Sequence, residues 1–348
     1  MRIEAFHAGL RERCSQFVNG HPDALFYQSL PYIEFMQEML DARNETRVLV
    51  AETGEVRGFL PILAMDGPHG RVLNSLPFFG SHGGILSTDA HSHAALVSEF
   101  NRVAAEPDVA SAVLIGNPFS DADYSGVEAN AADERIGQFT MLEPVAGQAA
   151  SDTVWDLLHS KTRNMVRKAE KSAIEVRVEG AESLEFLQKT HLENIRALGG
   201  QAKPDAFFSL LRKHFRSSDD YSLYVARIAG SPVAALLVFH FGRFAEYFMP
   251  VVTAEVRALQ PISLLAFRAM VDALGRGARI WNWGGTWPSQ QGVHQFKRRW
   301  GTRERPYKYH VQLRRPGLTQ RTPGEILSAY PYFYVLPFGM TKGTRVTT

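Results

Sequence analysis

The chain has 348 residues, of which 45% are hydrophobic and 21% are charged. A chain of this length and composition can bury a sizeable core and is long enough for two domains. Its single cysteine, Cys14, excludes an internal disulfide framework and favours a reducing compartment. No apolar run approaches the roughly 20 residues of a membrane-spanning helix, and the N-terminus lacks the apolar stretch of a signal peptide. These features predict a globular protein of the cytoplasm.

The net charge of +2 combines two halves of opposite sign. Residues 1–150 contain 9 Arg, no Lys and 20 Asp and Glu, a net charge of −11, whereas residues 151–348 contain 29 Lys and Arg and 16 Asp and Glu, a net charge of +13. This asymmetry indicates that the second half faces a polyanion, such as a nucleic acid, a pyrophosphate-bearing carrier, an anionic membrane surface or a phosphorylated cofactor. Two charged surfaces without a partner are the alternative.

The predicted elements repeat along the chain. Residues 48–52 and 56–63 predict a strand, a turn and a second strand, and residues 223–228 and 232–240 repeat this pattern. Each hairpin lies between two helix-like segments, and a further strand precedes the second of them. These four segments are residues 32–40, 94–105, 207–215 and 263–274. The order predicts an α+β fold of tandem units, each a mixed, largely antiparallel sheet flanked by helices.

We expect the boundary between the two units in the small-residue stretch Ala146–Ala150. This gives an acidic N-terminal unit at residues 1–150, a basic C-terminal unit with the active site at residues 151–313, and a tail at residues 314–348. Pro and Gly punctuate the tail, which contains the aromatic run Tyr330–Tyr334. This run is expected to pack on the surface, and an interfacial membrane contact is the alternative.

The most informative segment comprises residues 280–301. Residues 280–286 (IWNWGGT) form a short apolar run that ends in Gly-Gly, which is typical of a buried strand leaving a core. Residues 292–301 (GVHQFKRRWG) predict a helix with three consecutive cations between Phe296 and Trp300, which share one helix face. A strand end, a glycine turn and a cation-bearing helix can hold an anion or a developing negative charge. A solvated basic helix packed by two aromatic residues is the alternative.

This segment resembles the C-terminal signature of the Fem-type (FemAB-like) transferases, a branch of the GNAT acyltransferase superfamily. The similar pieces are Asn-x-Gly-Gly-Thr, Gly-Val-x-x-Phe-Lys-x-x-Trp-Gly and the closing Tyr307-Lys308-Tyr309. The basic segment 160–169, Tyr247, Arg257 and residues 261–265 follow in the family's order. The resemblance covers residues 155–310 well and the N-terminal half more loosely. It implies tandem GNAT-like units that transfer an acyl or aminoacyl group.

The segment Arg257–Ile262 helps to indicate which donor co-substrate the protein uses. Ordinary GNAT enzymes resemble one another in an Arg/Gln-x-x-Gly-x-Gly/Ala turn, whose backbone N–H groups hold the pyrophosphate of coenzyme A. Here Gln260 and Ile262 replace the glycines, and Pro261 removes an N–H donor. The better-known Fem-type members use aminoacyl-tRNA. The resemblance therefore implies no tightly bound cofactor and leaves aminoacyl-tRNA and acyl-CoA open as the donor co-substrate.

Lys297 and Tyr247 are the expected catalytic residues. The resemblance implies that Lys297 lies near the phosphate of the donor or near the developing negative charge. Arg163, Arg167 and Lys171 recur every four residues on one helix stripe, which suits phosphate contact. The full set of expected substrate-binding residues is Arg163, Arg167, Asn194, Arg196, Arg257, Asn282, Gly284, Gly285, Phe296 and Arg298.

No residue identifies itself as the general base; Glu246 and Glu255 are candidates because they lie beside Tyr247 and Arg257 in the sequence. No metal site is predicted, because His91 and His93 lack further ligands at a recognisable spacing, and a surface loop is expected there. The absence of a nucleophile elbow, a P-loop and a dinucleotide-binding motif disfavours serine hydrolysis, nucleotide hydrolysis and dehydrogenation.

Three functions remain open. The first is an acyltransferase that joins an acyl or aminoacyl group to an amine on a cell-envelope, peptidoglycan or polysaccharide precursor. The second is a GNAT N-acetyltransferase that uses acyl-CoA or an acyl carrier protein to modify a sugar or a small molecule. The third is a non-catalytic, polyanion-binding scaffold. Expected partners are phosphate-rich (tRNA, a lipid-linked sugar or a CoA-type molecule), and a peripheral contact with the inner membrane surface is an alternative to a purely cytoplasmic location.

Overall fold

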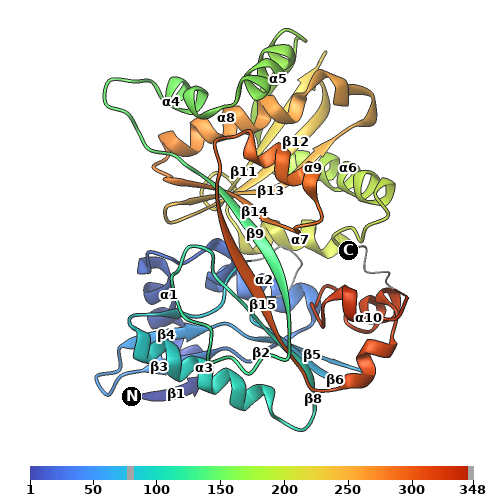
Figure 1. The fold of residues 1–348 in the computed structure, drawn as a ribbon. Coiled ribbons are helices and arrows are strands. Elements are labelled where there is room, and N and C mark those ends of the chain that lie inside the picture. Colours follow the sequence, from blue (N-terminus) through green and yellow to red (C-terminus); the bar gives the residue numbers. More distant parts are fainter. Residues whose placement is uncertain (77–81, 344–348) are drawn as a thin grey trace. The chain divides into compact units, whose positions relative to one another are not determined.

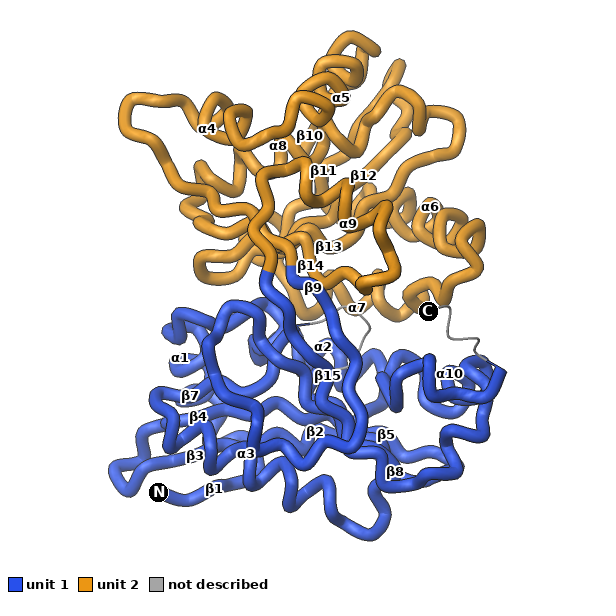
Figure 2. The backbone as a smooth tube through the Cα atoms, viewed as in Figure 1, with its two compact units in different colours: residues 1–137, 305–348 blue, residues 138–304 orange. Residues whose placement is uncertain are grey.

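The computed structural model describes residues 1–76 and 82–343, and the chain forms two compact units (Figures 1 and 2). Unit 1 consists of residues 1–137 and 305–348, and unit 2 is the continuous segment 138–304. The chain leaves unit 1 in strand β9 (Ala131–Met141) and returns to it in strand β15 (Arg303–Leu313). The first crossing precedes the boundary expected near residue 150, and residues 314–348 group with unit 1.

Unit 1 is built from two sheets and the helices that cover them. One sheet has the spatial order β1 (Arg2–Ala5), β3 (Arg47–Val50), β4 (Val56–Leu60) and β7 (Leu86–Ser87). The other has the order β15, β8 (Val109–Ile115), β6 (Gly70–Asn74), β5 (Leu63–Gly67) and β2 (Arg43–Asn44). The α-helices are α1 (Arg11–Gly20), α2 (Leu30–Leu40), α3 (Ala90–Ala104) and α10 (Pro323–Ala329). Short 3-10 helices are Ala8–Leu10, Phe26–Gln28, Pro316–Gln320 and Phe338–Met340.

The strand predicted at residues 56–63 is divided between the two sheets of unit 1. β4 ends at Leu60 and β5 begins at Leu63, because Pro61 has no N–H to donate to a neighbouring strand. Helix α3 begins after Asp89, whose carboxylate accepts the Ser92 N–H at 2.8 Å. The surface loop expected around His91 and His93 is therefore wrong, since both residues lie in the first turn of this helix.

Unit 2 contains one sheet and six α-helices in the described part of its sequence. Its strands, in spatial order, are β10 (Glu175–Glu179), β11 (Tyr221–Ile228), β12 (Ser231–Phe241), β13 (Phe244–Val252), β14 (Ile280–Thr286) and the end of β9. Its helices are α4 (Ala150–Leu157), α5 (Ser160–Glu170), α6 (Leu184–Ala197), α7 (Asp205–His214), α8 (Pro261–Gly275) and α9 (Gln291–Arg298), with 3-10 helices at Ala181–Ser183 and Ala254–Leu259.

Alternating side chains of the unit 2 sheet meet different helices. Leu236 and Val238 point into the core that contains α8, against which α4 and α5 pack (Figure 1). Phe239 and Phe248 point to the other face, where the Phe207 ring of α7 lies 5.9 Å from that of Phe248. The period of two along each strand therefore places helices on both faces of the sheet.

The two units repeat one topological order. In unit 1 the antiparallel hairpin β5–β6 is followed by α3 and by β8, which pairs with β6 in parallel. In unit 2 the antiparallel hairpin β12–β13 is followed by α8 and by β14, which pairs with β13 in parallel. The predicted α+β class with tandem units of mixed sheets is confirmed.

The aromatic run Tyr330–Tyr334 contributes to the core of unit 1. Tyr330, Phe333 and Tyr334 are at most 1% exposed. The Asn74 side chain of β6 pairs with the backbone of Tyr334, donating from Nδ2 to its carbonyl and accepting from its N–H, both at 2.8 Å. The expectation that this run packs on the surface is wrong, and these three buried rings are not available to a membrane.

We predict that Asn74→Ala lowers the free energy of unfolding of unit 1 by about 2–4 kcal/mol, because it leaves the buried N–H and C=O groups of Tyr334 without partners. Urea unfolding followed by circular dichroism measures this loss. Asn19→Ala, at an exposed site on α1, is the control and should change stability by less than about 0.5 kcal/mol. Equal, small effects of the two substitutions would show that the C-terminal segment does not dock on β6.

Candidate active site

β13 and β14 pair over only three positions and then separate. The pairs are Phe244 with Ile280, Ala245 with Trp281, and Glu246 with Asn282, although both strands continue beyond them. The register of β12 with β13 shifts just after this point, where Phe248 is an extra residue in β13. A bulge of this kind bends a strand and increases its twist. The carboxyl ends of the two parallel strands therefore diverge beyond Glu246 and Asn282.

A buried hydrogen-bonded chain lies at the point of divergence. The Asn282 Nδ2 donates to the two carboxylate oxygens of Glu246 at 3.1 and 2.9 Å, and both residues are at most 1% exposed. The Asn282 Oδ1 accepts the Gly284 N–H at 3.0 Å. Gly284 has φ +75°, and a Cβ at this position would meet no atom within 4 Å. The turn thus requires glycine for its backbone angle, and the space beside Gly284 is open to a ligand.

The Lys297 side chain of α9 lies beneath the Gly284–Thr286 turn. Its Nζ donates to the carbonyl oxygens of Gly284 and Gly285, each at 3.3 Å, and to Thr286 Oγ1 at 2.9 Å. Only 7% of Lys297 is exposed, and burial lowers the pKa of its amine from 10.5 to about 7. The three oxygens favour the ammonium form, so the amine is held in place while it titrates near neutral pH.

The hydrogen bonds of Lys297 continue through Thr286 to Gln138 of β9. Thr286 Oγ1 donates to Gln138 Oε1 at 3.0 Å, and Gln138 Nε2 donates to the carbonyl oxygen of His294 at 3.2 Å and to Glu304 Oε1 at 3.4 Å. His294 Nε2 lies 2.9 Å from Glu304 Oε1. Because Gln138 accepts from Thr286, the Thr286 oxygen remains free to accept from Lys297. Nothing in the local sequence around Gln138 predicted this role.

Aromatic rings pack around Trp283, the residue before the glycine turn. The Trp283 ring lies 4.8 Å from Tyr247, 6.1 Å from Phe296 and 5.2 Å from Trp300. Its Nε1 donates to Thr140 Oγ1 at 2.9 Å. Burial raises the pKa of the Tyr247 hydroxyl, so Tyr247 is neutral at physiological pH. The structure therefore brings together six expected site residues: Lys297, Tyr247, Asn282, Gly284, Gly285 and Phe296.

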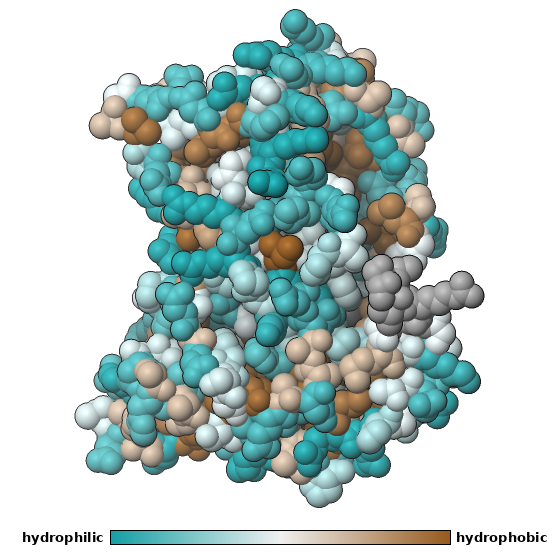
Figure 3. Space-filling model, in the orientation of Figure 1, coloured by the Kyte–Doolittle hydropathy of each residue, from teal (hydrophilic) through white to brown (hydrophobic). Residues whose placement is uncertain are grey.

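The two expected phosphate-binding arginines of α5 lie against Trp155. Their guanidinium carbons lie 5.9 Å (Arg163) and 4.9 Å (Arg167) from the centre of its ring, and Arg163 Nε donates to the Trp155 carbonyl at 3.1 Å. Arg167 is exposed, as is Lys171, which caps the helix. Hydrophilic residues predominate over α5 on the face shown in Figure 3. Arg167 and Lys171 are thus accessible to an anion, whereas Arg163 also supports the end of α4.

The remaining expected residues are dispersed over unit 2. Asn194 of α6 pairs with the backbone of Val252 at the end of β13, through bonds of 2.9 and 3.1 Å, so it fixes that strand. Arg196, Arg257 and Arg298 are exposed. Arg298 follows the buried Lys297 directly. Only Arg298 of this adjacent pair could therefore form part of a cationic surface.

The start of α8 differs from a glycine-rich phosphate turn in its backbone. Gln260 precedes the helix with φ +64°, and Pro261 is its first residue. The side-chain Nε2 of Gln260 donates a hydrogen bond to the Arg257 carbonyl at 3.3 Å. The first residue of the helix has no N–H, and the residue before it is not glycine. The usual arrangement for holding a pyrophosphate is therefore absent at this turn.

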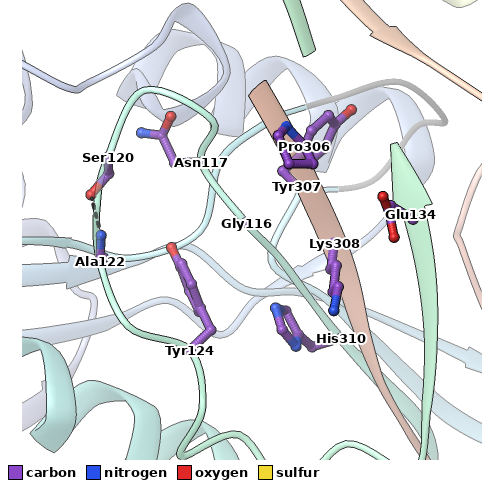
Figure 4. A pocket seen from close by; sticks show the side chains of 10 residues that line it. All are labelled: Gly116, Asn117, Ser120, Ala122, Tyr124, Glu134, Pro306, Tyr307, Lys308 and His310. Atoms are coloured by element: carbon purple, nitrogen blue, oxygen red, sulfur yellow. Dashed lines mark hydrogen bonds between the residues drawn. The ribbon is translucent and has the colours of Figure 1, made fainter. Parts of the chain in front are cut away.

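Unit 1 carries a pocket of about 440 Å³ that no sequence motif predicted (Figure 4). Lys308 and His310 lie side by side on β15, and Tyr124 faces them from the loop after β8. The His310 and Tyr124 rings are stacked, with centres 5.4 Å apart and planes at 22°. Burial, with the nearby Lys308, lowers the pKa of His310, so its ring is neutral at pH 7. Glu134 of β9 completes a wall that offers one carboxylate, one ammonium and a flat aromatic surface.

In residues 1–76 and 82–343, no helix is long and apolar enough to cross a membrane. Within the same ranges, no three His, Cys, Asp or Glu residues are grouped so that they could hold a metal ion.

Residues 160–298 match the protein family described as "Acetyltransferase (GNAT) domain". This segment contains α5, the diverging strands β13 and β14, and α9 with Lys297. The sequence match identifies residues 160–298 as an acetyltransferase (GNAT) domain, and the architecture of unit 2 agrees with this assignment. The search among curated proteins found no match for the chain.

Solved structures similar to this chain extend over both units. The crystal structure of FemX has a TM-score of 0.68 at 13% identity, covering 89% of this chain and 97% of FemX. A conserved protein of unknown function from Bacteroides thetaiotaomicron has a TM-score of 0.59 at 8% identity, covering 90% and 100%. L-PGS from Bacillus licheniformis has a TM-score of 0.53 at 11% identity, covering 92% and 96%. The fold of the chain is thus similar to that of FemX, as the resemblance at residues 280–309 implied.

We predict that Lys297 makes stability depend on pH. Its pKa is lower in the folded chain (about 7) than in the unfolded chain (10.5), so between these values the unfolded state binds more protons. The stability of the wild type relative to Lys297→Met should therefore rise with pH, by up to about 1.4 kcal/mol per pH unit between pH 7 and 10. Urea unfolding at several pH values measures this difference.

Lys308→Met, which changes an exposed lysine, is the control for this experiment. Its stability relative to the wild type should stay constant over the same pH range. A constant difference for Lys297→Met as well would mean that the Lys297 amine is protonated in the folded protein throughout.

Proposed function

We propose that this acyltransferase joins an aminoacyl or acyl group to an amine on a cell-envelope precursor, such as a peptidoglycan or polysaccharide precursor. The observation that carries the proposal is the separation of β13 and β14 beyond Glu246 and Asn282, where Gly284 has open space beside it and Lys297 supports the turn from within. Ligands of sheets with parallel strands bind beyond the carboxyl ends of the strands, where neighbouring connections diverge. A reacting carbonyl placed there would lie next to a fixed glycine turn supported by a cation.

The reaction forms one bond and breaks one bond. The acceptor nitrogen attacks the carbonyl carbon of the donor, an amide C–N bond forms, and the ester or thioester bond to the donor breaks. The nitrogen must be neutral when it attacks, and the proton that it loses leaves with the departing oxygen or sulfur. Lys297 is the proposed source of the positive charge that stabilises the carbonyl oxygen as it becomes negative. Tyr247 is the proposed neutral wall beside it.

The start of α8 supports aminoacyl-tRNA over acyl-CoA as the donor. Pro261 and the left-handed Gln260 replace the turn that would hold the pyrophosphate of coenzyme A. The exposed cations Arg167 and Lys171 on α5 offer phosphate contacts spread along a surface, which suits a nucleic acid better than a single pyrophosphate. Arg196, Arg257 and Arg298 are proposed to add to this phosphate binding.

The pocket of unit 1 supports an acceptor that carries a sugar. A flat neutral surface formed by Tyr124 and His310 suits packing against a sugar ring, and Glu134 and Lys308 can hydrogen-bond to its hydroxyl, amide or carboxylate groups. Neither Glu134 nor Lys308 has an ion-pair partner among residues 1–76 and 82–343. Both side chains therefore remain available to the acceptor.

Donor and catalytic residue can be tested together. The purified protein is incubated with labelled aminoacyl-tRNA or labelled acetyl-CoA and an amino-sugar or muropeptide acceptor, and amide product is measured. We predict product with aminoacyl-tRNA. Lys297→Ala should lower kcat by about 10²-fold and leave donor binding within about twofold, because its charge acts mainly on the transition state.

Arg299→Ala is the control, since it removes a neighbouring cation that does not contact the Gly284–Thr286 turn. Equal and small losses in the two variants would contradict a catalytic role for Lys297. Product from acetyl-CoA alone would instead support the acyl-CoA-dependent alternative.

If the unit 1 pocket binds the acceptor, a substitution in it should change the KM for the acceptor. His310→Ala removes half of the stacked surface and should raise the KM for a sugar-bearing acceptor by up to about tenfold, since such contacts contribute about 0.5–1.5 kcal/mol. The kcat and the KM for the donor should change by less than about twofold. Initial rates at varied acceptor concentration measure this. His7→Ala, at an exposed site of unit 1, is the control, and an unchanged acceptor KM in both variants would exclude the pocket from acceptor binding.

A further inference from the structure

A second pocket of unit 1 is lined by arginines that none of the preceding arguments uses. It has a volume of about 510 Å³ and lies between the turn of the β5–β6 hairpin and the segment that follows β15. Three cationic side chains, Arg314, Arg315 and Arg321, line it together with His69. Leu318 also lines it and is only 2% exposed, so the pocket has an apolar component as well.

Tyr330 fixes the wall that the β5–β6 turn provides. Its Oη donates to the Gly70 carbonyl at 2.8 Å and accepts the His69 N–H at 3.2 Å. Gly70 has φ +114°, and a Cβ there would approach the Asp108 carbonyl oxygen to 2.7 Å, so only glycine fits. Since Tyr330 is fully buried, the turn that carries His69 is held rigidly.

The arginines of this pocket are incompletely neutralised. No hydrogen bond or ion pair of the Arg314 guanidinium occurs within residues 1–76 and 82–343. Arg315 Nη2 donates to the Pro107 carbonyl at 3.3 Å, and Arg321 Nη1 lies 3.8 Å from the Glu325 carboxylate. Within residues 1–76 and 82–343, the one ion pair of these three arginines is thus that of Arg321 with Glu325, at the outer limit of an ion-pair distance.

This positive charge is unusual for unit 1. Residues 1–137 contain 9 Arg and 19 Asp and Glu, a net charge of −10, whereas residues 305–348 contain seven Lys and Arg and one acidic residue, a net charge of +6. An anion attracted to unit 1 would therefore be directed to the surface formed by its C-terminal segment.

We propose that this pocket binds a phosphate group, at a site separate from the acyl-transfer site of unit 2. Arginine forks bind phosphate through paired N–H···O bonds, and three guanidinium groups around one concave site can surround a single phosphate. The pocket volume leaves room for the organic part of a phosphate ester beside Leu318. The ligand class is a phosphomonoester or phosphodiester, carried either by a soluble molecule or by a phospholipid headgroup.

Isothermal titration of the full-length protein with inorganic phosphate and with pyrophosphate tests this site without requiring acyl transfer. The wild type should bind, and the double variant Arg314→Ala/Arg321→Ala should raise the Kd at least tenfold, with circular dichroism as a check on folding. The affinity of the wild type should fall between about 50 and 200 mM salt, because phosphate contacts release counterions.

Two control variants separate this site from other cations. Arg11→Ala removes an arginine of unit 1 that is half exposed and paired with Glu34, and it should leave the Kd unchanged. Arg177→Ala removes an exposed arginine of unit 2 that is paired with Glu175, and it should also leave the Kd unchanged. No binding by the wild type, an unchanged Kd in the double variant, or an equal rise of the Kd in the control variants would each overturn the proposal.

Flotation with vesicles then distinguishes the two sources of phosphate. Phosphatidylcholine vesicles with and without about one third phosphatidylglycerol are mixed with the wild type and the double variant. Binding that needs phosphatidylglycerol and is lost in the double variant assigns the pocket to a phospholipid headgroup. Phosphate binding in titrations without vesicle binding assigns it to a soluble phosphate ester.

Discussion

The Lys297 amine lies among three oxygens that belong to a single short turn of β14. Removing an ammonium group from water is costly unless hydrogen bonds replace those of the solvent, and here Gly284 O, Gly285 O and Thr286 Oγ1 replace them. The same bonds hold the turn in place, because a shift of either glycine carbonyl would leave the buried amine with fewer acceptors. Helix α9 and strand β14 are thereby fixed to each other at the point where the site opens.

Gly284 connects the Lys297 amine to the buried Glu246 side chain through Asn282. Asn282 donates to the Glu246 carboxylate and accepts from the Gly284 N–H, while the Gly284 carbonyl accepts from Lys297. The Gly284 N–H and C=O belong to two successive peptide groups, so buried side chains hold both peptide groups of the turn. The turn is therefore held by hydrogen bonds to buried side chains on its two sides. A turn held in this way needs little rearrangement when charge develops on a substrate, which is the property that electrostatic catalysis requires.

The strand, turn and helix of this site could be predicted from the sequence, but only some of the contacts between them could. Strand 280–286, its Gly-Gly end and the helix with Phe296 and Trp300 were predictable because each depends on neighbours within a few residues. The helix pattern alone would place Lys297 outside with Arg298. The structure instead buries it, since its acceptors lie 11 to 13 residues earlier, across a loop. Gln138 was not predictable, because it reaches Thr286 from a strand 148 residues away.

The hairpins and the helices that flank them were also predictable, because a period of two and a period of 3.6 are local properties. The division of strands between the sheets of unit 1 and the place of the tail were not predictable. Pro61 divides one predicted strand between two sheets, and the Tyr330–Tyr334 run contacts β6 across about 260 residues of sequence. The sequence of an aromatic run in a tail does not determine whether the run is exposed or buried, because burial depends on a partner segment that lies far away in the sequence.

The path of the chain imposes an order on the assembly of the two units. Unit 2 is one continuous segment, so all of its contacts can form once residue 304 has been made. Unit 1 needs both ends of the chain, because β15 completes its second sheet and the segment Tyr330–Leu336 fills its core. Contacts between distant segments close large loops and form slowly. Until the C-terminal segment docks, β8 lacks its neighbour β15 and Asn74 lacks its Tyr334 partner. The aromatic residues of the tail therefore act as the last structural elements of unit 1, and the cationic pocket beside Tyr330 exists only once that unit is complete.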